Sequence, residues 1–147
     1  DEDYVVPFGK ARIALAAAQD AVDAGESVGV VTYGMGVYWA MNAAKSLVGQ
    51  VEVLDLRTLS PYDEEAIETL TKKHGKVLVL TEETLRNSFA EALAGRISQS
   101  CFQYLDAPIR TMGSADVPAV PLNAAMEAIM LPNADKVEAV LREMLES

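Results

Sequence analysis

Two residues of this chain have side chains that often do chemistry, its only histidine and its only cysteine. His74 could act as a general base near neutral pH, because imidazole titrates there without help from its surroundings. It lies in the polar run Thr71–Gly75 at a predicted helix end, where solvent and the helix dipole suit an imidazolium. Cys101 falls on the same predicted helical face as Leu93 and Ile97, the position of a core thiol rather than of a nucleophile. We therefore predict a structural role for both.

A glycine turn, Gly34-Met35-Gly36, lies between a predicted strand and a predicted helix, and Asp55 follows about twenty residues later. This arrangement imitates the fingerprint of dinucleotide-binding folds. Trp39 stands where the third glycine of that fingerprint would let the helix pack closely. Two interpretations stay open, a nucleotide- or anion-binding module and a tight structural turn.

Two adjacent carboxylates, Glu82 and Glu83, directly follow a predicted strand, at the edge where α/β folds place functional loops. They are the best candidates in the chain for acid–base work or for a contact. No second catalytic group lies near them in the sequence, and no serine has a GxSxG elbow. We therefore expect an exposed loop end or a helix cap.

Met35, Tyr38 and Trp39 cluster near the same edge and could either pack in the core or bind a partner. In a doubly wound layout, apolar and charged side chains converge at the carboxyl ends of the strands. We therefore predict that another domain covers this edge in the full protein. The predicted interface residues are Met35, Arg57, Glu82, Arg86 and Phe89. We predict no catalytic, cofactor-binding or metal-binding residue within the chain.

Strand-like and helix-like apolar patterns alternate along the sequence. Strands are predicted over Val28–Tyr33, Val51–Leu56, Val77–Leu80 and Pro108–Met112. Helices are predicted from Val37 to Val48, from Ser60 or Pro61 to His74, from Ala90 to Cys101 and from Val137 to Leu145, with a short one over Leu122–Ile129 after a crossing loop. Residues 10–24 favour a helix, with an edge strand over Ala11–Ala14 as the alternative. The alternation predicts an α/β fold whose mainly parallel sheet carries helices on both faces.

Length and composition exclude several classes of protein. The 147 residues, 50% of them hydrophobic, can bury one core, so we expect a single domain over residues 1–147. A net charge of −10 opposes nucleic-acid binding. We find no membrane span and no signal peptide, and one cysteine with one histidine cannot form an intramolecular disulfide or a zinc cluster. The missing initiator Met suggests a fragment of a longer chain.

The run Val51–Asp63, VEVLDLRTLSPYD, joins a buried strand to a helix start, with Ser60, Pro61 and Asp63 in the order that a helix N-terminus favours. Further motifs follow in compatible order. They are Pro7–Ala11, which begins within the entry segment of residues 1–9, Val31–Gly34, Asp55–Pro61, Gly75–Glu82, Phe102–Pro108 and Leu131–Asn133. Together these segments resemble the C-terminal domain of transketolase-like enzymes, and most closely the β subunit of the thiamine-diphosphate-dependent decarboxylase of 2-oxoacid dehydrogenase complexes.

The resemblance implies a three-layer α/β/α unit with a mixed, mostly parallel sheet of about five strands. It implies an oxidoreductase part without the catalytic centre, because thiamine diphosphate and Mg²⁺ sit between other domains in this family. The implied role is to build contacts with other domains or subunits and to help dock the acyltransferase core, in the bacterial cytoplasm or in the mitochondrial matrix of a eukaryote. The isolated domain is expected to be inactive, and another transketolase-like enzyme is the alternative.

Overall fold

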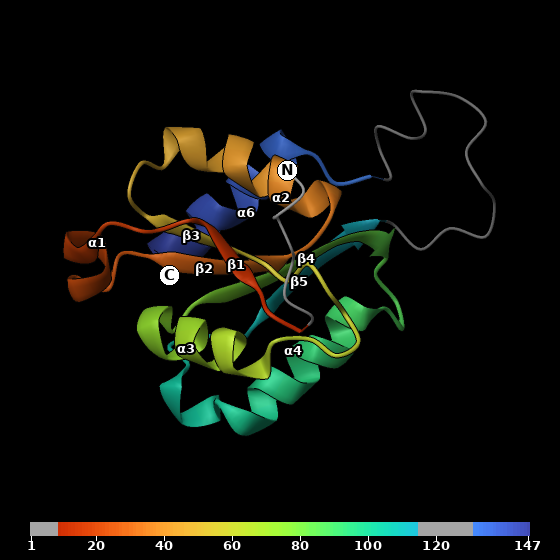
Figure 1. Cartoon of the computed structure of the whole chain (residues 1–147). Coiled ribbons are helices and arrows are strands. Elements are labelled where there is room, and N and C mark those ends of the chain that lie inside the picture. Colours follow the sequence, from red (N-terminus) through yellow and green to blue (C-terminus); the bar gives the residue numbers. More distant parts are fainter. Residues whose placement is uncertain (1–8, 115–130) are drawn as a thin grey trace, which may run out of the picture.

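A computed structural model describes residues 9–114 and 131–147. A five-stranded sheet lies between two layers of helices, α2 and α6 on one face and α3 and α4 on the other (Figure 1). The strands are β1 (Arg12–Leu15), β2 (Val28–Thr32), β3 (Val51–Asp55), β4 (Val77–Thr84) and β5 (Arg110–Ser114). The helices are α1 (Gln19–Asp23), α2 (Met35–Ala43), α3 (Glu64–His74), α4 (Phe89–Ser100) and α6 (Ala134–Glu146), with short 3₁₀ turns η1 (Ala44–Ser46) and η2 (Phe102–Tyr104).

The strand order is β1-β3-β2-β4-β5. The pairs β2–β3, β2–β4 and β4–β5 are parallel, and β1 pairs with β3 antiparallel. The predicted three-layer α/β/α fold with a mixed, mainly parallel sheet is therefore confirmed.

Each face of the sheet has its own core, because successive side chains of a strand point to opposite faces. Val51 and Val53 of β3 pack beneath α2 and α6, whereas Leu54 packs against α3 and α4. The middle strand β2 is fully buried, as expected for a parallel strand with helices on both sides.

The helix predicted over residues 10–24 is wrong, and the alternative edge strand is the better interpretation. Arg12–Leu15 forms β1, and only Gln19–Asp23 is helical. Pairing of β1 with β3 overrides the helix preference of the alanines. The main chain between β1 and α1 is also tied down, since the Ala17 N–H donates to Glu52 Oε1 at 3.2 Å and the Ala18 N–H to the Gly49 carbonyl at 2.8 Å.

Two other predicted boundaries need correction. The helix predicted from Ser60 or Pro61 begins at Glu64, since the Asp63 carboxylate caps it by accepting from the Ala66 N–H at 3.1 Å. Pro61 follows a cis peptide bond ahead of the helix. The helix predicted to reach Val48 ends at Ala43 and continues as η1.

The other predicted elements lie close to where they were expected. α3 ends at His74 with a left-handed Gly75, and Asn133 caps α6 by accepting from the Lys136 N–H at 2.8 Å. The strand predicted over Val77–Leu80 extends to Thr84, where it still pairs with β5. The lead-in segment up to residue 8, most of the crossing loop and the helix predicted over Leu122–Ile129 lie outside the described residues.

Candidate functional site

The topology brings the five predicted interface residues to one edge of the sheet. Met35 begins α2 shortly after β2, Arg57 follows β3, and Glu82 lies in β4. Arg86 lies in the turn after β4, and Phe89 is the first residue of α4. Because β2, β3 and β4 are parallel, these positions all lie at their carboxyl ends. We call this surface the carboxyl edge.

Tyr33 contacts both β4 and α4 at the carboxyl edge. Its hydroxyl lies 2.6 Å from Thr81 Oγ1 and donates to Glu83 Oε1 at 3.0 Å, which joins the end of β2 to β4. Its ring also meets Phe89 edge to face, with 6.2 Å between ring centroids. Burial is the main cause that raises the pKa of Tyr33, and the nearby glutamates act in the same direction. The phenol therefore stays protonated and can keep both hydrogen bonds.

Local caps and turns position the remaining residues of the carboxyl edge. Ser88 caps α4 by accepting from the Glu91 N–H at 3.3 Å, and Glu91 in turn accepts from the Asn87 N–H at 2.8 Å. Arg57 is a non-glycine residue with φ +61°, in the sparsely populated left-handed region. Its N–H donates to Asp55 Oδ1 at 3.0 Å, which supports this conformation. Such backbone at the end of a strand is typical of a functional surface.

The glycine turn is explained by packing, because its second glycine lies against β2. A Cβ on Gly36 would overlap Thr32 Oγ1, and the Thr32 hydroxyl itself donates to the Leu80 carbonyl at 2.9 Å. Gly34 has φ +57°, which only glycine adopts readily. The nearest side-chain atom to a Cβ built there is Glu82 Oε1, at 3.3 Å. A carboxylate in that place repels an anion, so of the two interpretations the structure favours a tight structural turn over an anion-binding site.

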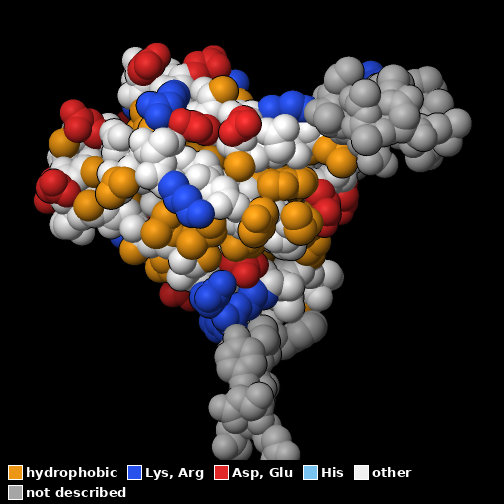
Figure 2. Space-filling view, turned by 90° about the horizontal axis from the view of Figure 1, so that it is seen from above, with side chains coloured by type: hydrophobic (Ala, Val, Ile, Leu, Met, Phe, Trp, Pro, Cys, Tyr) orange, Lys and Arg blue, Asp and Glu red, His pale blue; other side chains and the backbone are white. Residues whose placement is uncertain are grey.

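The aromatic and methionine cluster divides between core and surface. Trp39 and Met41 are partly buried and pack against the core beneath α2 and α6. Met35 and Tyr38 are 46% and 64% exposed, so α2 presents two large apolar side chains to solvent. Hydrophobic side chains gather on this face of the molecule, between acidic and basic groups (Figure 2).

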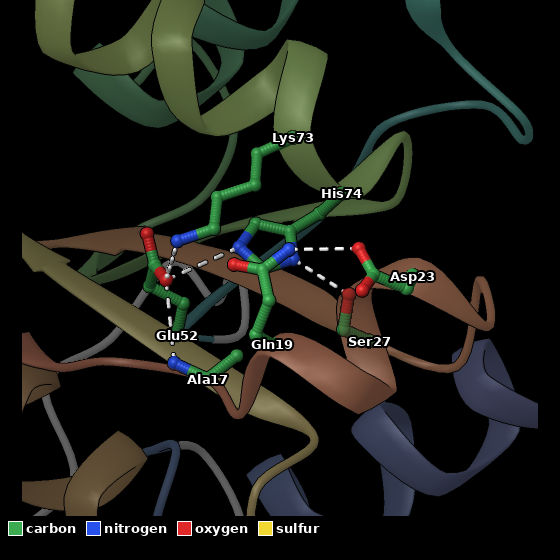
Figure 3. A network of polar contacts seen from close by, with 7 residues as sticks. All are labelled: Ala17, Gln19, Asp23, Ser27, Glu52, Lys73 and His74. Atoms are coloured by element: carbon green, nitrogen blue, oxygen red, sulfur yellow. Dashed lines mark hydrogen bonds and ion pairs between the residues drawn. The ribbon is translucent and has the colours of Figure 1, made fainter.

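His74 lies in a buried network that the sequence did not reveal, so the expectation of a solvated helix end is wrong. Its Nδ1 lies 2.7 Å from Ser27 Oγ, and its Nε2 lies 3.5 Å from Glu52 Oε1 (Figure 3). Lys73 Nζ donates to the same oxygen at 2.9 Å. In β3, Glu52 lies between the buried Val51 and Val53. An acidic residue in a buried strand needs partners, so that signal was available in the sequence.

Burial by itself would raise the pKa of Glu52, but the His74 and Lys73 side chains and the Ala17 N–H together lower it to about 2. At 3.5 Å the His74 contact is longer than an ordinary N–H···O bond, and no hydrogen bond satisfies the Nε2 atom among the described residues. Lys73 is therefore the stronger partner. The carboxylate is ionised at neutral pH, which anchors β3 to the end of α3.

The contacts of His74 with Ser27 on one side and Glu52 on the other look like a catalytic triad, but burial excludes that role. Ser27 is 1% exposed and the His74 side chain is fully buried, so no substrate reaches the hydroxyl. Cys101 is 2% exposed within the α3/α4 core, as predicted. Within residues 9–114 and 131–147, no group of three or more His, Cys, Asp and Glu side chains could hold a metal ion.

Comparison with known proteins assigns this fold to a family. The sequence model "Transketolase, C-terminal domain" matches residues 17–137, and the chain belongs to this family. It is 41% identical over 148 aligned residues to the 2-oxoisovalerate dehydrogenase subunit beta of Bacillus subtilis, an alignment that covers 99% of this chain and 43% of that protein. It is 38% identical to the pyruvate dehydrogenase E1 component subunit beta of Rhizobium meliloti, over 95% of this chain and 29% of that protein.

The chain is thus similar to the β subunits of 2-oxoacid dehydrogenase E1 components, and it spans less than half the length of these relatives. A solved structure described as a split-gene transketolase, inactive β4 tetramer, superimposes with a TM-score of 0.75 at 22% identity, over 99% of this chain and 44% of that one. This likeness supports the fold. Within the described part of the chain, no helix is long and apolar enough to cross a membrane.

Proposed function

We propose that this chain is the C-terminal domain of the β subunit of a thiamine-diphosphate-dependent decarboxylase component, and that it serves assembly rather than chemistry. The observation that carries the proposal is the 41% identity, over 99% of the chain, to a 2-oxoisovalerate dehydrogenase subunit beta. The full enzyme would oxidatively decarboxylate a 2-oxoacid and transfer the acyl group to lipoyl groups. It would work in the bacterial cytoplasm or in the mitochondrial matrix.

The described residues do not fit thiamine diphosphate and Mg²⁺. A diphosphate needs amide or cationic donors, yet the Glu82 carboxylate lies against the Gly34 turn. The Gly36 and Val37 N–H groups already donate to the Tyr33 and Gly34 carbonyls, at 3.1 and 3.2 Å. The described part of the chain also offers no three-ligand cluster for a metal. We therefore assign the cofactors to another part of the full protein and derive no step through them.

The carboxyl edge is the surface that we assign to contacts with other domains or subunits of the decarboxylase. It combines the exposed Met35 with Phe89, whose ring is held between Tyr33 and Tyr62. Apolar anchors fixed by their neighbours lose little side-chain freedom when they bind a partner. The acyltransferase core is the second partner that the family relationship suggests.

The proposal is tested by mixing the 147-residue chain with thiamine diphosphate, Mg²⁺ and a 2-oxoacid. We expect no decarboxylation, and turnover above the rate of a chain-free mixture would show that the catalytic centre lies here. The full-length subunit assembled with its partner subunit is the positive control, and branched-chain 2-oxoacids and pyruvate are the substrates to compare.

Two other interpretations are separated by simple measurements. A nucleotide- or anion-binding module would release or absorb heat with NAD, ATP or coenzyme A in calorimetry, and we expect no heat at millimolar ligand. Another transketolase-like enzyme would be recognised from the sequence of the full protein, because a thiamine-diphosphate motif there would settle the class.

A further inference from the structure

A groove of about 350 Å³ lies between the edge strand β1 and α3. Ile13 of β1 forms one side, Ala66, Thr69 and Leu70 of α3 form the other, and Glu52 and Leu54 of β3 lie between them. Ile13 is 55% exposed, so the groove has a solvent-accessible apolar side. The groove thus combines apolar and charged side chains, and Glu52 is the most buried of its carboxylates.

Glu52 has an unused acceptor in this groove. Its side chain is 3% exposed, and the contacts from Lys73, His74 and Ala17 all end on Oε1 (Figure 3). Among the described residues no hydrogen bond to Oε2 is found, although an ionised carboxylate oxygen is a strong acceptor. Among the described residues, His74 Nε2 is the one fully buried polar side-chain atom without a hydrogen-bond partner. Oε2 of Glu52 is therefore not fully enclosed, and a donor can reach it.

The charges around the groove favour a cation. Glu52, Asp63 and Glu65 line it together with one base, Lys10, and Lys73 Nζ lies 2.9 Å from Glu52, which leaves one negative charge in excess. Both oxygens of Asp63 already accept backbone N–H groups, from Ala11 at 2.9 Å and from Ala66 at 3.1 Å. Glu52 is therefore the buried acceptor that remains for a ligand.

We propose that this groove binds an arginine or lysine side chain presented by a partner polypeptide. Such a side chain has an alkyl stem that packs against Ile13, Leu54 and Leu70 and a cationic head that donates to Glu52 Oε2. β1 is an edge strand, with β3 as its one strand partner in the described part of the chain, and an edge strand is the element to which an extended segment can add. The groove lies along the side of the sheet, and the inference does not rest on the proposed function.

The test uses acetyl-arginine amide as a probe, with acetyl-citrulline amide as an uncharged control of the same shape. The two are titrated to millimolar concentration into the 147-residue chain while the methyl resonances of Ile13, Leu54 and Leu70 are followed by NMR. We expect saturable shifts with the arginine probe and at least about tenfold weaker binding of the citrulline probe, the loss expected when a charged hydrogen bond becomes neutral. Equal shifts with both probes, or shifts that do not saturate, would overturn the proposal.

Two substitutions tie binding to the groove. Thr69 is exposed on α3, so Thr69→Trp should fill the groove without disturbing the core and weaken the arginine probe at least about tenfold. Glu52→Gln should remove the preference for arginine over citrulline, whereas the exposed Glu68→Gln on the same helix as Thr69 should leave it unchanged. If Thr69→Trp binds the arginine probe as tightly as the parent chain, the proposal fails, whatever the stability of the Glu52 variant.

Other occupants would be recognised in the same experiments. Methyl shifts that depend on protein concentration without any probe would assign the groove to a second copy of this chain and would overturn the proposal. Spermine binding at least about tenfold more tightly than acetyl-arginine amide would indicate a small polyamine ligand and would overturn it as well.

Discussion

Replacing Glu52 by glutamine should destabilise the fold by about 3 kcal/mol at neutral pH. The folded state lowers the pKa of this carboxyl from 4.5 to about 2. A difference of about 2.5 pH units at about 1.4 kcal/mol per unit gives roughly 3 kcal/mol of stabilisation by the ionised form. Glutamine keeps the shape of the side chain but loses the charge. Lys73 is 34% exposed in the parent and can turn to water in the variant, so a larger loss is not expected.

The effect must depend on pH in a definite direction. Because the pKa of Glu52 is lower in the folded state than in the unfolded state, its ionisation stabilises the fold fully above about pH 5. That contribution is lost as the pH falls from about 4.5 towards 2, where the carboxyl is protonated in both states. The difference between the parent and Glu52→Gln should therefore be largest at neutral pH and should shrink as the solution is acidified.

Urea unfolding of the parent and the variant at about pH 7, 5 and 3 measures this difference. Glu68→Gln is the matched control, since its ion pair with Lys72 is exposed and should contribute less than about 1 kcal/mol. A gap between the parent and Glu52→Gln that stays constant down to about pH 3 would refute the assignment of the stabilisation to charge. A Glu52→Gln variant as stable as the parent at neutral pH would refute that assignment as well.

Three further substitutions, one of them with a matched control, test local packing and hydrogen bonding by thermal or urea unfolding. Gly36→Ala should cost about 1–3 kcal/mol because its Cβ would overlap Thr32, whereas Gly95→Ala, in open space on α4, should be neutral or stabilising by up to about 1 kcal/mol. Asp63→Ala should cost about 1–2 kcal/mol, since it removes the cap of α3 and an anchor for the chain before β1. Tyr33→Phe should cost about 1–2 kcal/mol at neutral pH, because two hydrogen bonds of the hydroxyl are lost. The pKa of Tyr33 is raised in the folded state, so above about pH 10 the phenol ionises more readily in the unfolded chain. The stability advantage of the parent over the variant should therefore decline above that pH.

The alternation of patterns predicted most of the fold, because parallel strands buried on both faces are apolar throughout and their helices are amphipathic. β3 and α6 show this directly, with Val53 and Val137 fully buried in the same core. The edge strand β1 was harder to predict. Its alanine-rich surroundings favour a helix locally, and its pairing with Asp55, Leu54 and Val53 depends on residues about forty positions away.

Polar residues gave the weakest predictions, since their roles depend on long-range contacts. His74 was expected at a solvated helix end, yet its ring meets Ser27 and Glu52 from two strand ends. The placement of Met35 and Glu82 at the carboxyl edge followed from topology alone, because residues after parallel strands share one edge. The packing of Glu82 over Gly34 did not follow from any sequence pattern.

The measurement that tests the assembly role most directly is hydrogen exchange of the carboxyl edge. Amide exchange of residues 33–37, 55–59 and 82–89 should be compared between the 147-residue chain and the complete decarboxylase assembly. We predict protection of these three segments in the assembly by at least about tenfold, as expected for amides that a partner covers. Exchange at the same rate in the chain and in the assembly would contradict the assignment of the carboxyl edge as a contact surface.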